Sequence, residues 1–260
     1  MKLFHYTDAN ALKSVLENGK VWLSDIRFLN DHNEYKDGEE NIVRSFDEKL
    51  ASENEDDSNK IKTALSGFID SSKSSYTMIC SFSQGEDLLS QWRGYCPKLG
   101  GYAIEFTNPD MKGFIAPLHE CIYEDEKKKS ATDSLFDLAK KVLINKKGDR
   151  TKLFQTTWSN IAKFKNRGFS EEREMRLIVF KKKDDQSIKF RVRESLIIPY
   201  IESDIPYEKI SAIWIGPCID SALAKESLSS YLLSLSKNPK HPFSKIGVPE
   251  IKISAVSYRG

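Results

Sequence analysis

The sequence predicts an α+β fold with mixed or antiparallel sheets. Segments rich in β-forming residues occur near both ends and in the middle of the chain, and stretches with helical spacing of apolar residues lie between them. The two kinds of segment do not alternate strictly, which disfavours a doubly wound parallel sheet. At 260 residues the chain can bury a substantial core, and we expect a single domain over 1–260.

The first half of the chain predicts a strand, a helix and then short strands around a helical insert. Thr7 or Asp8 can cap a helix, and Gly19 suits its carboxyl end. An acidic, serine-rich stretch with helical patches predicts a peripheral insert at about 41–75. Apolar β-forming runs predict strands at 21–23, 76–83 and 102–106, and a short helix is expected at 87–95.

The second half begins with a helical pair at about 131–165, which Gly148 and Asp149 divide. Beyond Gly168 the sequence becomes β-rich, with one more helix whose inner face carries Leu228 and Leu235. Trp214, in the strand expected at 210–216, should be buried in the core of the protein. Strands are expected near 174–181, 187–193, 196–201, 210–216 and 250–258.

Composition excludes several classes of protein. The net charge of +2 gives no reason to expect binding to a nucleic acid or an anionic membrane through a global field. The four cysteines are widely spaced without a C-x-x-C pair, so neither a disulfide framework nor a metal site is expected. No apolar segment is long enough to span a membrane and no signal peptide begins the chain, so we expect a cytoplasmic protein.

Two polar clusters are candidates for a functional site. His5-Tyr6-Thr7 lies near the start of the chain, and Glu172, Glu174 and Arg176 precede an apolar run. If 172–180 is extended, these last three side chains share one face of the strand. They form either an ion-paired strand, with Arg176 bound to one of the glutamates, or a ligand site. If function alone maintains this crowding of charge, Glu174→Gln should cost little stability.

Other features have a structural interpretation beside the functional one. His5 could be an ordinary core or surface histidine, or it could present its imidazole to a sugar. Trp92 and Tyr95 are three residues apart, so on a helix they lie on the same face. That face could pack into the core or provide a platform on which an aromatic ring stacks. The nucleotide-loop, Rossmann, hydrolase and zinc-protease motifs do not occur in the sequence.

Taken together, the motifs resemble a widespread bacterial family of unknown function. Its members share an amino-terminal H-Y-T, an N-D-x-x-E loop, a serine-bearing strand, a W-x-x-Y helix and a late E-x-E-x-R strand. The resemblance covers about residues 1–220, and it departs from the family at Met175, where an aromatic is usual, and in the Asn30 loop, which lacks a proline. The matching segments are His5–Thr7, Asn30-Asp31 with Glu34, Ser81–Ser83, Ser90–Tyr95, Tyr102–Phe106 and Glu172–Arg176.

More distantly, this order of motifs is similar to the ADP-ribosyltransferase superfamily, which implies an ADP-ribosyltransferase-like core of mixed and antiparallel sheets with peripheral helices. It also implies that NAD is the substrate, with no metal. Glu174 would be the catalytic carboxylate and Glu172 would orient the acceptor. The side chains that the resemblance assigns to NAD are His5, Tyr6, Thr7, Arg27, Ser83, Trp92, Tyr95 and Arg176, the two arginines meeting phosphate or carboxylate groups.

The resulting hypothesis is an NAD-dependent ADP-ribosyltransferase-like enzyme, a toxin or phage-defence effector, that acts on a protein or nucleic-acid acceptor. An inhibitory or defence-system partner protein would go with that role, and no membrane partner is expected. Two alternatives stay open. The same site could release ADP-ribose to water and deplete NAD, or the chain could be a non-enzymatic nucleotide-sensing or interaction module.

Overall fold

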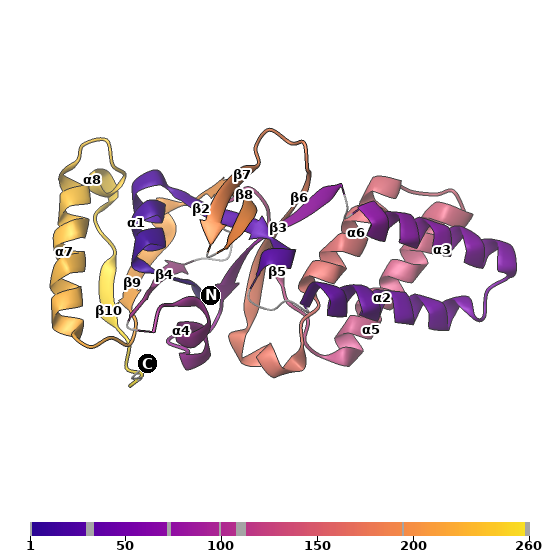
Figure 1. Cartoon of the computed structure of the whole chain (residues 1–260), viewed down its shortest axis with the longest axis horizontal. Coiled ribbons are helices and arrows are strands. Elements are labelled where there is room, and N and C mark those ends of the chain that lie inside the picture. Colours follow the sequence, from indigo (N-terminus) through magenta and orange to yellow (C-terminus); the bar gives the residue numbers. More distant parts are fainter. Residues whose placement is uncertain are drawn as a thin grey trace.

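The computed structural model describes residues 2–29, 34–71, 74–98, 100–107, 113–193 and 195–257. These residues form a mixed α+β structure in which ten strands build one open sheet, drawn in the middle of Figure 1. The strands are β1 (Lys2–Thr7), β2 (Lys20–Asp25), β3 (Ser75–Ser83), β4 (Tyr102–Thr107), β5 (Leu118–Glu120), β6 (Glu174–Lys182), β7 (Lys189–Arg193), β8 (Leu196–Asp204), β9 (Ile210–Ile215) and β10 (Glu250–Ile253).

Helices gather at the two ends of the sheet. Figure 1 shows α7 and α8 at one end and α2, α3, α5 and α6 together at the other. No described helix is both long and apolar enough to cross a membrane. The helices are α1 (Ala9–Asn18), α2 (Glu34–Leu50), α3 (Glu55–Asp70), α4 (Leu89–Tyr95), α5 (Asp125–Ala139), α6 (Arg150–Lys163), α7 (Ser221–Lys237) and α8 (Phe243–Ile246). Shorter segments are the 3-10 helices η1 (Ile26–Phe28), η4 (Arg167–Glu172) and η5 (Tyr207–Lys209) and the π-helix η3 (Lys140–Ile144).

The sheet forks at β3. Along one edge β3 pairs with β6 over nine residue pairs, from Ser75 to Ser83. Along its other edge it pairs with β1 at Ser83 and with β2 at Met78 and Ile79. One arm continues through β1, β4, β9 and β10, and the other through β2, β8 and β7. Only β9 and β10 run parallel among the described pairs, so the sheet is mixed.

Alternation along the strands divides the sheet into two faces. The face that carries Tyr6, Ser83 and Glu174 is called the Glu174 face, because Phe4 lies opposite Ser83 and Ser83 opposite Glu174. The Leu3 face packs against α1 and α7 in the largest apolar core. On the Glu174 face, Trp92 of α4 packs on the first arm, and Ala162 of α6 packs beside Ile79 and Ile178.

The four helices α2, α3, α5 and α6 enclose an apolar core of their own, which includes Phe46, Phe136 and Trp158. The first of these helices begins at Glu34, earlier than the predicted insert. Asp149 caps α6 by accepting a hydrogen bond from the backbone N–H of Thr151 (2.7 Å), at the break that the sequence predicted. Because Ala162 also packs against the sheet, α6 connects this helical lobe to the Glu174 face.

The boundaries of α1 follow from local sequence. Asp8 accepts a hydrogen bond from the Ala11 N–H at 2.8 Å, so Asp8 and not Thr7 is the cap. Gly19 ends the helix with a left-handed φ of 66°, a conformation that glycine adopts without the steric cost of a Cβ. The predicted 250–258 strand is shorter in the structure and ends at Ile253.

Glu105 of β4 organises the first arm on the Glu174 face. Its side chain is 2% exposed and accepts hydrogen bonds from Trp214 Nε1 (2.8 Å) and Ser211 Oγ (2.8 Å). Lys2 and Lys252 each place an ammonium 3.1 Å from its carboxylate. Burial alone would raise its pKa, but these four donors outweigh burial and lower the pKa of Glu105 to about 2.

Trp214 should be a major source of stability for this arm. It is buried, as predicted, and packs edge-on against Phe4 with ring centroids 6.2 Å apart. Trp214→Ala should lower the free energy of unfolding by about 3–5 kcal/mol, because it leaves a cavity and removes a donor from Glu105. Trp214→Phe keeps most of the volume and should cost about 1–3 kcal/mol for the lost donor. Urea denaturation measures the free energy of unfolding of both variants. Equal losses of stability in Trp214→Ala and Trp214→Phe would contradict the separate contributions of ring volume and hydrogen bond.

The contribution of Glu105 should depend on pH. Its pKa is about 2 in the folded chain against 4.5 ordinarily, so between these values the unfolded chain binds more protons. The carboxylate therefore contributes its full stability above about pH 4.5 and loses it as pH falls toward 2. The difference in unfolding free energy between the native chain and Glu105→Gln, measured from pH 7 to pH 2.5, should shrink as pH falls. A constant difference would contradict the assignment.

Candidate functional site

A buried network of charged side chains lies on the Glu174 face where β6 begins. Glu174 Oε1 accepts from Arg176 Nε at 2.7 Å, and Oε2 accepts from Arg176 Nη2 at 2.9 Å. The Lys165 ammonium, which follows α6, donates to Glu174 Oε2 at 2.5 Å. Glu174 is 3% exposed and Arg176 is 1% exposed. Two cations therefore hold this carboxylate from both sides, away from bulk water.

Two more carboxylates complete the network. Glu172 Oε2 accepts from the same Lys165 ammonium at 2.6 Å. Glu34, from the first turn of α2, accepts from Arg176 Nη2. Arg176 Nη1 donates to the carbonyl of Ala162 in α6 at 2.6 Å. The network thus joins α2, the end of α6 and β6 in one buried cluster.

The two glutamates lie in different backbone elements. β6 begins at Glu174, in agreement with the strand expected near 174–181, whereas Glu172 ends the short helix η4, so 172–180 is not extended throughout. Arg173 between them has a left-handed φ of 41°, which interrupts the extended conformation. The Ser83 hydroxyl donates to the carbonyl of Glu172 at 2.6 Å and fixes this turn. The two carboxylates still converge, because both bind Lys165 rather than because they share a strand face.

Charges in the network do not balance. Three carboxylates face two cations, which leaves one negative charge in excess when all are ionised. Burial would raise the pKa of Glu174, but the charges of Arg176 and Lys165 lower it to about 2. For Glu34 and Glu172 burial outweighs the same cations, so the pKa of each is raised. Glu174 therefore stays ionised, and the other two carboxylates are the groups that can take up a proton.

Four predicted site residues lie on the same face as Glu174 or at its edge. Tyr6 packs edge-on against Trp92, with ring centroids 4.7 Å apart, and its hydroxyl donates to the carbonyl of Gly85 at 2.9 Å. Ser83 lies directly opposite Glu174 in the β3–β6 ladder. Tyr95 is 37% exposed, and burial of its hydroxyl together with the charge of Glu174 raises its pKa. Tyr95 is thus the exposed aromatic beside the network.

His5 and Thr7 are not brought to this face. They alternate with Phe4 and Tyr6 along β1, so their side chains lie on the Leu3 side of the strand. The imidazole of His5 fills the fork, with Nδ1 3.0 Å from the carbonyl oxygen of Ser81. Burial lowers its pKa, and its ring packs 5.4 Å from that of Phe82. His5 is therefore a buried, neutral imidazole that packs between β1 and β3.

The two arginines predicted to meet phosphate already have carboxylate partners. Arg27 binds Asp25 through Nε (2.6 Å) and Nη2 (3.2 Å), and Asp25 is fully buried. Arg176 binds Glu174 and Glu34. Since a bidentate carboxylate occupies the same edge of the guanidinium that a phosphate would use, neither arginine offers that edge to a ligand.

Lys165 is the site residue that sequence reasoning missed. It follows an amphipathic helix, and nothing in its local sequence distinguishes it from a solvated lysine at a helix end. Glu34 belongs to the N-D-x-x-E motif but had no assigned role, and Asn30 and Asp31 of that motif lie outside the described residues. Phe169 was missed too: it is 39% exposed and its ring centre lies 5.3 Å from the Lys165 ammonium.

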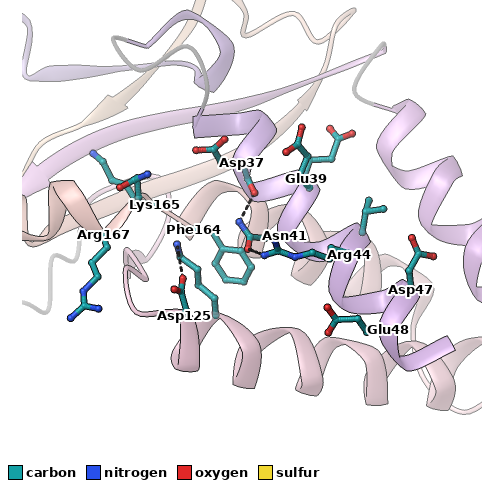
Figure 2. A pocket seen from close by; sticks show the side chains of 14 residues that line it. Asp37, Glu39, Asn41, Arg44, Asp47, Glu48, Asp125, Phe164, Lys165 and Arg167 are labelled. Carbon is teal, nitrogen blue, oxygen red and sulfur yellow. Dashed lines mark hydrogen bonds and ion pairs between the residues drawn. The ribbon is translucent and has the colours of Figure 1, made fainter. Parts of the chain in front are cut away.

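A cleft of about 890 Å³ lies beside the network, between α2, the start of α5 and residues 164–167. Figure 2 shows Lys165 and Arg167 on one side of it and the acidic side chains of α2 on the other. Lys165 belongs to both the cleft and the network. The described residues contain no group of three metal-ligating side chains that could hold an ion.

Residues 91–177 match the family described as Protein of unknown function (DUF2971). The match covers about a third of the chain and runs from α4 into β6, so it includes Trp92, Tyr95, Lys165, Glu172 and Glu174. It fits the uncharacterised family that the motifs resemble. No curated protein matches the chain, and no solved structure does.

The network changes the stability expected of Glu174→Gln. The sequence alone suggested a small cost, but this change removes the partner shared by two buried cations, so it should cost about 3–5 kcal/mol. Glu172→Gln should cost less, because among the described residues the Glu172 side chain pairs with Lys165 alone and its pKa is already raised. Urea denaturation at pH 7 compares the two variants directly. A larger loss for Glu172→Gln would contradict the proposed order.

Proposed function

We propose that this chain is an NAD-dependent ADP-ribosyltransferase-like enzyme that breaks the bond between nicotinamide and ribose. The observation that carries the proposal is the excess of negative charge in the buried network, next to an exposed aromatic ring. Breaking this bond generates an oxocarbenium-like centre, which a preorganised carboxylate stabilises. Glu174 stays ionised at every physiological pH because its pKa is about 2.

In this reaction the C–N bond breaks and its electron pair leaves with the nicotinamide nitrogen. The positive carbon is stabilised by Glu174 and then attacked by a nucleophile of the acceptor. Glu172 is the better group to take the nucleophile's proton, because its raised pKa makes it the stronger base of the two. Lys165 holds both carboxylates, at 2.6 Å and 2.5 Å, and acts as a positioning residue.

The aromatic residues divide into two roles. Trp92 is 3% exposed and donates through Nε1 to Asp87 at 2.8 Å, so it serves as packing behind Tyr6. Tyr95 and Phe169 keep exposed rings near Lys165, and these are the surfaces that would meet a nicotinamide ring. Ser83 and Tyr6 support the site from β3 and β1 without facing solvent.

The acceptor would be a protein or nucleic acid, in keeping with a toxin or phage-defence effector controlled by a partner protein. With water as the acceptor, the same carboxylates would make an NAD glycohydrolase. The forked sheet supports an ADP-ribosyltransferase-like core, because β1 carries the H-Y-T motif, the neighbouring β3 carries the serine, and β6 on the other side of β3 begins at Glu174, the second glutamate of the E-x-E motif.

A specific observation favours a second candidate, the non-enzymatic nucleotide-sensing or interaction module. Glu174 is 3% exposed and its two oxygens already bind three donors. A carboxylate so fully engaged suits a structural role as well as a catalytic one. In that case NAD would bind without release of nicotinamide.

Mass-spectrometric detection of nicotinamide distinguishes these candidates. We expect release by the native chain, and a fall in turnover of about 10²–10³-fold in Glu174→Gln with little change in NAD affinity. The assay is run at a temperature where circular dichroism shows that the variant is folded. Tyr95→Ala, which leaves the carboxylates intact, should mainly raise KM. Full activity in Glu174→Gln would exclude Glu174 as the catalytic group.

A further inference from the structure

Arg191 of β7 is a partly buried arginine that pairs with no carboxylate among the described residues. Within the described part of the chain it makes no ion pair, whereas Arg27 and Arg176 are both paired. Its Nη2 donates to the hydroxyl of Ser24 at 3.0 Å, and its Nε is shielded from solvent with no hydrogen-bond partner. A guanidinium carries five N–H donors, so Arg191 keeps donors besides the shielded Nε and the one that Ser24 accepts, and these could bind a ligand.

The surroundings of Arg191 are aromatic and open. The centre of its guanidinium lies 5.5 Å from the Trp22 ring, and Trp22 lies 4.7 Å from the ring of Tyr200. Trp22 is 37% exposed and Arg191 is itself partly exposed, so both side chains can meet a ligand. A fork of guanidinium donors beside exposed aromatic surface is the combination that recognises a phosphate attached to a nucleoside.

The charged side chains around Arg191 are compatible with the binding of an anion. Lys189, on the same strand face, binds Glu202 at 2.9 Å. Burial lowers the pKa of Arg191, the positive charge of Arg193 lowers it further, and Asp8 and Tyr200 oppose this. Asp8 already accepts the hydrogen bond that caps α1. An incoming phosphate would therefore meet the guanidinium of Arg191, which has no ion-pair partner among the described residues, in the field of the nearby positive charge of Arg193.

The register of the sheet places Arg191 on the Glu174 face. Ser24 lies opposite Ile79, which shares a strand face with Ser83, and Ser83 lies opposite Glu174. Four residues of β3 and the strand spacings on either side give a separation of roughly 15 Å between Ser24 and Glu174. An extended dinucleotide is long enough to span such a distance, but it would have to pass outside α6, because Ala162 packs on Ile79 between the two ends.

We propose that Arg191, with Ser24 and the Trp22–Tyr200 pair, binds the phosphate-bearing end of a nucleotide whose other end reaches Glu174. This inference rests on the proposed function, in which the nucleotide is NAD. It gives the phosphate-binding role to Arg191 instead of to Arg27 and Arg176.

Isothermal titration with ADP-ribose tests the subsite without any reaction. We expect Arg191→Ala to weaken binding about 10- to 100-fold, the loss of a charge-assisted hydrogen bond. Lys225→Ala, which removes the same charge from exposed α7, should bind like the native chain. Arg191→Lys keeps the charge but loses the planar fork and should be intermediate. Equal weakening in Lys225→Ala would show a general charge effect and overturn the subsite.

Turnover separates this proposal from the proposed function. Where nicotinamide is released, Arg191→Ala should raise KM for NAD about 10- to 100-fold with kcat nearly unchanged. An unchanged KM would overturn the subsite and leave the enzyme proposal intact. Tight ADP-ribose binding that depends on Arg191, without nicotinamide release by the native chain, would support the subsite and reject the enzyme. Circular dichroism of each variant checks that it is folded.

Discussion

The hydrogen bonds that Lys165 and Arg176 donate to three buried carboxylates are the interaction on which the rest of the structure depends. They join α2, the end of α6 and β6, and so attach the helical lobe to the sheet. Burying these charged groups removes their hydration, and the ion pairs that Lys165 and Arg176 make with the carboxylates offset part of that cost. Apolar residues of similar size could hold the same elements together, so stability alone does not account for the network. Its unequal charge suits a site that must stabilise positive charge.

The central ladder of β3 and β6 makes this arrangement rigid. Nine paired residues fix the positions of Ser83, Glu174 and Arg176 relative to one another. The fork on the opposite edge of β3 lets the two arms of the sheet diverge, and His5 closes the gap with its imidazole near the carbonyl of Ser81. The sheet therefore holds the buried carboxylate of Glu174 on one side of the fork. On the other side lies Arg191, whose Nε has no hydrogen-bond partner among the described residues.

Exposure differs sharply across this face. Glu174 is 3% exposed, whereas Tyr95 and Trp22 are both 37% exposed. Glu174 is thus held in place inside the protein, whereas the two aromatic side chains are accessible. Preorganised charges behind accessible aromatic rings would give a nucleotide both a stacking surface and a field that strengthens as positive charge develops.

Local sequence determined the elements of this fold, and tertiary structure determined the site. The cap at Asp8, the left-handed Gly19, the strand ending at Ser83 and the burial of Trp214 follow from propensity and periodicity, which depend on neighbouring residues. The sequence also pointed to Glu172 and Glu174, although Arg173 interrupts the extended conformation that would have placed both on one strand face. Lys165, Glu34 and Arg191 could not be recognised, because their partners lie on other elements of the chain. Periodicity shows which face a side chain takes, but only the folded chain decides which charges meet.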